Sequence, residues 1–374
     1  MSWQPRSLDE LGFVSRGRSR HRPRDAAHLY GGSHPFVQTG DVKHAGLYLN
    51  EYSQTYSDAG LEQSRMWPKG TLCITIAANI ADTAILGIDA CFPDSVIGFI
   101  PDEARADARF IKYLFDALLK KRLMQFTQGV AQDNLSQGKL LSLKFPVPSG
   151  TEQRRVADIL SAYDDLIENN RRRIQLLEQA ARLLYKEWFV HLRFPGHEHV
   201  KIKDGIPEGW EKKSIGKLSP LKYGKALKAD ERIPGPYPVY GSSGIVGSHS
   251  KALVPGPAII VGRKGNVGSV YWSQTDFYPI DTVYFIESAH CSLYLYHALL
   301  QTQFISTDVA VPGLNRDYAH SRLLLVPEGK IHVLFEQHAK VMHDQIERLT
   351  KYNQSLTSAR DLLLPRLMSG EVAV

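Results

Sequence analysis

Cysteine is scarce in this chain: there are three in 374 residues, an odd number, and they stand far apart. Cys73 and Cys91 sit in the apolar runs LCITI and ACFP, and Cys291 stands alone. Such a set builds neither a disulfide framework nor a thiolate metal site. We therefore expect buried free thiols and a reducing compartment.

Long apolar runs are also missing. No stretch reaches the roughly 18 apolar residues that a membrane span needs. The N-terminal segment MSWQPRSLDELG has no apolar core of a secretion signal. We therefore expect a cytoplasmic protein with no membrane partner.

Several enzyme motifs are absent. A methyltransferase needs a Gly-rich turn after a strand and an (N/D)PP(Y/F) tetrapeptide, a nucleotide-binding loop needs GxxxxGK(S/T), and none of these occurs. The segment VGRKGNVG, residues 261–268, resembles a phosphate loop, but strand-like SVYW follows where a helix should begin, which favours a β-hairpin. Pro93-Asp94 lacks the Glu-x-Lys strand of a metal-dependent nuclease. The sequence predicts a chain without catalytic residues.

Three histidines lie close together in HLRFPGHEH: His191, His197 and His199. They have no cysteine nearby and stand in a polar segment, which favours solvated side chains over metal ligands. We expect no metal site.

The overall composition is that of a globular protein, with 43% hydrophobic and 22% charged residues, and the length allows two or three domains. A net charge of +6 and a pI near 9.0 favour a polyanionic partner, although the excess is modest for 42 kDa.

The chain contains a copy of itself. A shift of 179 residues superposes Leu177 on Leu356 and Leu184 on Leu363, and it needs no gap from Val130 to the C-terminus. Upstream the offset drifts to 181, 186 and 207, as it would where loops vary in length. The repeat predicts the order globular unit, long helix, globular unit, long helix.

Each globular unit holds short β-rich runs, such as TLCITIAANI and AIIVG, separated by Gly, Pro and Asn. One helical stretch accompanies them, at residues 109–124 and 293–304. This mixture predicts an α+β fold with a mostly antiparallel or barrel-like sheet.

The two helices carry apolar residues at alternating spacings of four and three, from Val156 to Trp188 and from Phe335 to Leu367. A period of 3.5 residues predicts a coiled-coil seam. Each seam includes one asparagine, Asn170 or Asn353, and a buried amide prefers a polar partner. Pairing the two amides predicts an antiparallel coiled coil with a pseudo-twofold axis. The alternative is two amphipathic helices that each pack on their own unit.

Basic loops occupy corresponding places in the two units: SRGRSRHRPRD, residues 15–25, and SPLKYGKALKADER, residues 219–232. Arginine forks fit phosphates and guanine edges, and lysines fit phosphates, so the pair predicts two DNA-reading units. The alternative is a pair of solvated loops without a partner. The residues expected to contact DNA are Arg16, Arg18, Arg20, Arg22, Arg24, Lys43, Asn79, Lys222, Lys225, Lys228, Arg263 and Lys264.

These features resemble the specificity (S) subunit of Type I restriction-modification enzymes, over essentially the whole chain. The most specific segments are residues 152–189, which begin EQRRVADIL, and residues 355–372, SLTSARDLLLPRLMSGEV. YGSSGIVG (240–247) and VGRKGNVGSVYW (261–272) are similar to segments of the family's recognition domains. The second helix departs from the first in that Glu336-Gln337 falls five residues late relative to Glu152-Gln153.

The resemblance implies two target-recognition domains, residues 1–149 and 207–328, each reading one half of a bipartite double-stranded DNA site. It implies two conserved helices, residues 150–193 and 329–374, that form a coiled coil and fix the gap, with a linker at 194–206. It also implies two methylation (M) subunits and two restriction/translocase (R) subunits as partners. This chain would then need no cofactor, because S-adenosylmethionine, ATP and Mg²⁺ would be bound by those partners.

We expect apolar residues at the helix ends to be exposed, and these are the candidates for the subunit interface: Trp188, Phe189, Leu364 and Met368. The alternative is that they pack on the chain's own domains. Two rival functions remain: an orphan or phage-derived interaction protein that binds the methylase or DNA without supporting modification, and a fused DNA-modifying enzyme.

Overall fold

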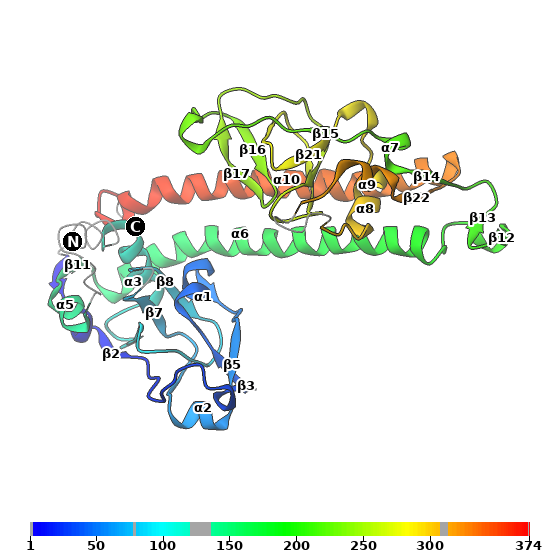
Figure 1. Ribbon diagram of the computed structural model, residues 1–374. Coiled ribbons are helices and arrows are strands. Elements are labelled where there is room, and N and C mark those ends of the chain that lie inside the picture. Colours follow the sequence, from blue (N-terminus) through cyan, green and yellow to red (C-terminus); the bar gives the residue numbers. More distant parts are fainter. Residues whose placement is uncertain (1–2, 78–79, 120–135, 307–312, 373) are drawn as a thin grey trace. The chain divides into compact units, whose positions relative to one another are not determined.

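The computed structural model describes residues 3–77, 80–119, 136–306, 313–372 and 374. The chain divides into two units: unit 1 comprises residues 1–172 and 349–374, and unit 2 comprises residues 173–348. Each unit therefore consists of one α+β body and a segment from each of two long helices, α6 and α10 (Figure 1).

The two long helices begin at positions related by the sequence repeat. Helix α6 is Gly150–Tyr185, with 36 residues, and α10 is Gly329–Met368, with 40 residues. Their first residues are 329 − 150 = 179 positions apart, which is the repeat offset. The predicted pair of long helices is confirmed.

The helix seam can be followed within unit 1. Asn170 Nδ2 donates to Asn353 Oδ1 over 2.9 Å, and Asn353 Nδ2 donates to the Ile167 carbonyl over 3.2 Å. Asn170 is buried, so the second amide satisfies a side chain that water does not reach. The predicted amide pair is present. Asp164, which precedes Asn170, forms an ion pair with Arg360, which follows Asn353, so the two segments run antiparallel.

The body of unit 1 is built on two mixed sheets and a two-stranded ribbon. The first sheet has the order β2-β10-β7-β8-β4: Gly12–Arg16, Val96–Pro101, Leu72–Thr75, Thr83–Leu86 and Tyr48–Leu49. The second has the order β5-β3-β9-β6: Gln54–Tyr56, Tyr30–Phe36, Ala90–Cys91 and Met66–Trp67. The ribbon pairs β1 (Gln4–Arg6) with β11 (Phe145–Val147).

The body of unit 2 repeats this plan. Its first sheet has the order β15-β21-β18-β19: Lys222–Tyr223, Val283–Ile286, Ala258–Gly262 and Val270–Ser273. Its second has the order β17-β16-β20: Gly244–His249, Tyr237–Gly241 and Tyr278–Pro279. Ribbons join β14 (Glu211–Ser214) to β22 (Leu323–Val326) and β12 (Ile202–Lys203) to β13 (Ile206–Pro207).

The strand pairings of the two bodies correspond one to one in most positions. In the first sheet of each body, the edge strand that comes first in the sequence pairs with the strand that comes last, β2 with β10 and β15 with β21. The next two strands of each sheet form a hairpin, β7-β8 in unit 1 and β18-β19 in unit 2. In each, one strand of the second sheet has an antiparallel and a parallel neighbour. The predicted α+β repeat is confirmed, and so is the hairpin at residues 261–268.

Short helices complete both bodies. In unit 1 they are α1 (Thr39–His44), α2 (Asp58–Glu62), α3 (Ala108–Leu114), which continues as the π-turn Phe115–Leu119, and α5 (Gln137–Ser142). In unit 2 they are α7 (Ile215–Leu218), α8 (Leu293–Gln301) and α9 (Arg316–Ser321). Single 3-10 turns lie at Leu8–Glu10, Ala27–Leu29, His197–His199, Ala229–Glu231 and Ser288–His290, and α6 ends in a π-turn at Lys186–Val190.

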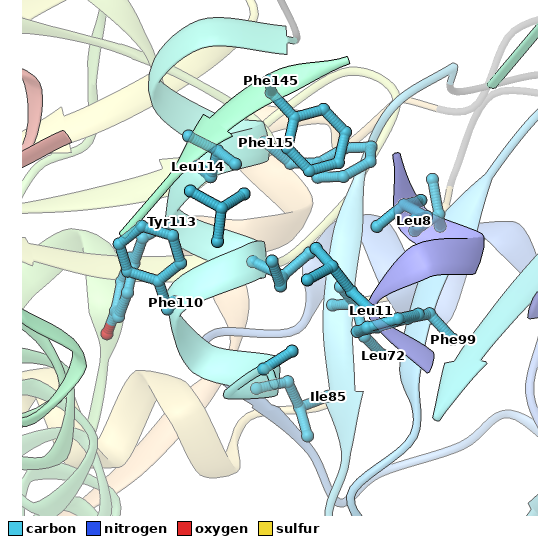
Figure 2. Close-up of a cluster of buried hydrophobic side chains, with 14 of the residues drawn as sticks. Leu8, Leu11, Leu72, Ile85, Phe99, Phe110, Tyr113, Leu114, Phe115 and Phe145 are labelled. Carbon is cyan, nitrogen blue, oxygen red and sulfur yellow. The ribbon is translucent and has the colours of Figure 1, made fainter. Parts of the chain in front are cut away.

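The core of unit 1 lies between the first sheet and α3. Phe110 and Leu114 of α3 belong to the same buried cluster as Leu72 and Phe99 of the sheet (Figure 2). The continuous apolar run LCIT of β7 is buried on both faces, which explains why it shows no alternation. The same cluster includes residues from both long helices, such as Leu160 and Leu367. The body and the helices of unit 1 therefore share one hydrophobic core.

The Glu-Gln dipeptides attach each long helix to its body. Gln153 is fully buried; its Oε1 accepts from Asp107 N at the start of α3, and its Nε2 donates to the Arg105 and Pro148 carbonyls. In unit 2, the Glu336 carboxylate accepts from Leu293 N and Tyr294 N at the start of α8. Glu336 thus makes the same kind of contact in unit 2 as Gln153 makes in unit 1, from a position one turn further along its helix.

The cysteines are free: Cys73 and Cys91 are buried and Cys291 is half-buried. Burial raises the pKa of Cys291 to about 11. Within the described residues, no helix has both the length and the apolar character needed to cross a membrane.

Candidate nucleic-acid interface

The basic loop of unit 1, residues 16–24, leaves the edge strand β2 from a fixed point. Gly17 N donates to Val96 O over 2.9 Å and Arg18 N donates to Phe92 O over 3.0 Å. A Cβ at Gly17 would lie 2.3 Å from the Phe92 carbonyl oxygen, so only glycine fits here. The loop is therefore attached rigidly where it leaves the sheet.

The arginines of this loop fall into two groups. Arg22 Nη1 donates to the Ser19 and His21 carbonyls over 2.7 and 2.8 Å, and Arg24 forms an ion pair with Asp94 at 2.8 Å. The others are exposed, and within the described part of the chain their side chains form no hydrogen bond or ion pair: Arg16, Arg18 and Arg20. Two of the five predicted contacts thus shape the loop, and three are available to a polyanion.

The cationic cluster of unit 2 is built around the ring of Tyr223, which is 48% exposed on β15. The guanidinium carbons of Arg263 and Arg316 each lie 5.0 Å from the ring centroid. Arg263 Nη1 also donates to the Asp281 carbonyl. Among the residues that the structure describes, neither arginine has a carboxylate partner, so two positive charges share one exposed ring. An anionic ligand would offset this charge.

The lysines of the second basic loop are less uniform than the sequence suggests. Lys222 is paired with Glu287 at 2.5 Å, whereas Lys225 and Lys228 are exposed. Lys264 lies exposed beside Arg263 in the β18-β19 hairpin. The structure thus places Arg263 of the hairpin against Tyr223, the residue after Lys222, although the two basic segments are far apart in the sequence.

Two predicted contacts remain, Lys43 and Asn79. Lys43 is on α1 and lines a pocket of about 740 Å³ in unit 1, together with Asp164 and Arg360, rather than the basic loop. Asn79 lies outside the described residues. The role of both in DNA binding stays a prediction.

Sequence reasoning missed four residues of these clusters: Gln63, Ser64, Arg65 and Arg316. Gln63, Ser64 and Arg65 precede β6 and contact the first loop or its strand from far along the chain. Arg316 begins α9 and reaches Tyr223 across the fold. None of the four belongs to a basic run or to a known motif, so the sequence alone gives no signal for them.

The candidates for a subunit interface are mostly buried in the chain's own core. Trp188 and Phe189 pack against Phe335 of α10 in unit 2, with ring centroids 5.9 and 5.0 Å away. Met368 is fully buried in the unit 1 core, and Leu364 is partly buried against it. Their expected exposure is therefore wrong, because the bodies cover both ends of the apolar seam. The alternative, packing on the chain's own domains, is what the structure shows for these residues, and a role in subunit contact stays a prediction.

The clustered histidines are near the end of α6. His197 Nδ1 hydrogen-bonds the Phe194 carbonyl at 2.8 Å, and His199 lies beside Glu198. Among the described residues, no group of three or more His, Cys, Asp or Glu could hold a metal ion.

The chain matches the model of one protein family, described as Type I restriction modification DNA specificity domain, over residues 1–179 and 207–316. It is 22% identical to the MjaIX specificity subunit of Methanocaldococcus jannaschii, over 100% of this chain and 94% of the relative. It is also 22% identical to the HindI specificity subunit of Haemophilus influenzae, over 97% of this chain and 98% of the relative.

A solved structure has the same fold. The S subunit of a Type I restriction-modification system from M. genitalium superposes with a TM-score of 0.62 at 18% identity, covering 98% of this chain and 96% of that one. The family model covers well over half of the residues, and each of its two matched stretches includes both main sheets of one repeated body. The chain therefore belongs to the family of Type I restriction-modification DNA specificity proteins.

Proposed function

We propose that this chain reads a bipartite, asymmetric double-stranded DNA site, one half with residues 1–149 and the other with residues 207–328. The observation that carries the proposal is duplication. Two bodies of the same strand order each have a cationic cluster beside the equivalent edge strand, β2 in unit 1 and β15 in unit 2. Phosphates would position the bodies, and the exposed arginines would read base edges.

The paired helices would determine the distance between the half-sites. A helical turn adds about 5.4 Å, so a change of one turn corresponds to roughly one to two base pairs. Site spacing would then follow from helix length.

In this proposal the chain is not itself an enzyme and binds no cofactor. Two M subunits would hold S-adenosylmethionine and receive the flipped target base, and two R subunits would use ATP and Mg²⁺. The repeat would provide two binding sites for the M subunit, because the body meets the helices in each unit.

An exposed apolar stripe on α6 supports docking of a partner. Ile159 and Leu166 in unit 1 are exposed and seven residues apart, hence on one face of the helix. In unit 2, Leu176 and Leu183 repeat this spacing. Large side chains exposed at regular intervals on a long helix fit a helical partner better than solvent.

Replacing Leu166 with glutamate should remove most binding of the M subunit. Leu166 is 44% exposed in the chain, and losing its burial in a complex would cost about 1.5–3 kcal/mol, roughly ten- to a hundredfold in affinity. Co-purification of the tagged chain with the M subunit measures this. Arg171→Gln is the matched control, because Arg171 is exposed on another face of the same helix and the change lowers the charge by the same amount; equal losses in both variants would refute the docking surface.

The test of the proposed function is methylome sequencing of the host with and without this gene. We expect one bipartite motif to lose methylation in the deletion strain and to regain it on complementation. An unchanged methylome, with the chain still bound to a methylase, would favour the orphan interaction protein. Binding of S-adenosylmethionine by the isolated chain would favour the fused enzyme.

A further inference from the structure

Three consecutive residues, Gln63, Ser64 and Arg65, lie against the arginine loop of unit 1. They connect α2 to β6 and are more than forty positions from the loop in sequence. Gln63 Oε1 accepts from Arg20 N at 2.6 Å and from His21 N at 3.0 Å. Ser64 Oγ donates to the Arg18 carbonyl at 2.8 Å. The main chain of the loop is therefore held by side chains from another segment.

These contacts alternate with the exposed arginines. Gln63 and Ser64 bind the main chain of Arg18, Arg20 and His21, and these bonds leave the guanidinium groups of both arginines uninvolved. Further along the loop, Arg22 donates to two main-chain carbonyls of the loop itself. The main chain is fixed and the side chains of Arg18 and Arg20 are left unengaged in the described structure.

Arg65 connects the same segment to the edge strand. Its guanidinium carbon lies 4.3 Å from the ring centroid of Trp67 and 4.9 Å from that of Phe13, which is on β2. Phe13 is about half exposed, whereas Trp67 is fully buried. The stack thus joins the strand that begins the arginine loop to the strand that follows Gln63 and Ser64.

Fixing the loop before binding has a direct energetic consequence. Ordering the main chain of one residue costs roughly 1–2 kcal/mol, and a loop that is already ordered avoids that cost when a ligand binds. This saving in binding free energy matters for a ligand that must fit one fixed loop geometry. It matters little for general attraction between charges, which many loop shapes can provide. Base readout requires such geometry, whereas general attraction to phosphates does not.

We propose that Gln63, Ser64 and Arg65 are positioning residues for base readout by unit 1. Gln63 and Ser64 hold the main chain in the shape from which Arg18 and Arg20 read the DNA, and Arg65 holds the supporting strands together. The inference rests on the proposed function and adds to it the residues on which discrimination at one half-site depends.

The chemistry of Gln63 supplies a sharp pair of variants. Within the described residues its Nε2 is buried without a partner, so the side chain contributes through Oε1 alone. Gln63→Met has a similar size and no acceptor. Gln63→Glu keeps an acceptor for both N–H groups and adds a charge that would weaken all DNA binding alike.

The experiment uses the full chain with the M subunit that co-purifies with it. Duplexes carry the motif found by methylome sequencing, or that motif with single base changes in one half-site or the other. In Gln63→Met we expect discrimination at one half-site to fall by about tenfold or more, with the other half-site and the melting temperature unchanged. In Gln63→Glu we expect the ratio of matched to mismatched affinity to stay within about threefold of the wild-type ratio at both half-sites.

Discrimination in Gln63→Met that equals that of the wild type would overturn the inference. So would an equal loss in Gln63→Glu, or a parallel loss at both half-sites, since a general structural role predicts either. Failure of the wild-type complex to distinguish matched from mismatched duplexes would instead refute the proposed function itself.

Discussion

Arg360→Ala is expected to lower the free energy of unfolding of unit 1 by about 3–5 kcal/mol, which is typical of breaking a buried ion pair. Arg360 of α10 forms an ion pair with Asp164 of α6, and Tyr113 of α3 donates its hydroxyl to the same carboxylate. The Asp164 side chain is only 10% exposed. Removing the guanidinium group would leave a buried carboxylate with a single phenol donor.

The network joins the body of unit 1 to both of its helix segments, so its loss should be visible in the whole unit. Burial, together with the negative charge of Asp164, raises the pKa of Tyr113, and the phenol therefore stays a donor. Urea denaturation followed by circular dichroism measures the effect. Asp361→Ala removes only the exposed partner of Arg360 and should cost less than about 1 kcal/mol.

A triple variant provides the decisive comparison. Arg360→Leu combined with Asp164→Leu and Tyr113→Phe removes both charges and the hydroxyl that donates to Asp164, and it should recover most of the stability lost in Arg360→Ala, because no buried charge or unpaired donor remains. If Arg360→Ala unfolds at the wild-type urea concentration, the ion pair does not stabilise the junction.

The sequence predicted the long helices and their pairing because those signals are local. A 3.5-residue period defines one face of a helix, and an asparagine in that face requires a polar partner. The repeat offset then specified where both helices begin, at Gly150 and Gly329. The duplicated α+β bodies followed from the same self-similarity, without any knowledge of the strand order.

The sequence could not show what covers each face. Trp188 and Phe189 were expected at a subunit interface, yet they contact Phe335 inside unit 2. Apolar periodicity identifies the buried side of a helix and says nothing of the partner. Likewise, Arg360 lies in the apolar repeat of α10, where a charged residue is unexpected. It is accommodated there because it pairs with Asp164, which also accepts from Tyr113, a residue far away in the sequence.

The candidate site shows the same division. The basic loops were visible in the sequence as runs of arginine and lysine. Which arginines are engaged within the protein and which are left exposed depends on tertiary contacts. Arg24 is engaged because Asp94 lies opposite it, and Gln63 matters because its carbonyl meets the main chain of the loop. Neither contact has a signature in composition or spacing.

The repeat places different chemistry at equivalent junctions. The 179 offset relates Asp164 to His343, and the upstream offset of 181 relates Asp116 to His297. In unit 1 the junction of body and helices is ionic, through Arg360 and Asp164. In unit 2 it is an imidazole pair, with His297 Nε2 and His343 Nε2 3.2 Å apart. The two units should therefore respond differently to acid.

Unit 2 is expected to lose stability as the pH falls below about 6.5. One histidine of the pair must donate and the other must accept through a neutral ring, and burial disfavours a positive charge on either ring. Burial, followed by the proximity of His343 and Arg182, lowers the pKa of His297 to about 3. Burial lowers the pKa of His343 to about 4, against a smaller opposing effect of Asp344. Unfolded histidines titrate near 6.5, so the unfolded state takes up protons first.

The stability that this pair contributes is complete above pH 6.5 and is lost as the pH falls toward the folded pKa values. Two pH units below 6.5, at about 1.4 kcal/mol per unit, His297 alone would cost unit 2 roughly 3 kcal/mol. The double variant His297→Phe/His343→Leu should flatten the difference in unfolding free energy between pH 7 and pH 4.5 by at least this amount. His199→Gln, an exposed histidine of the same unit, should leave the profile unchanged. Carboxylates also titrate in this range, but they are common to all three proteins. If the double variant and the wild type lose the same unfolding free energy between pH 7 and pH 4.5, the imidazole pair is not the acid-sensitive contact.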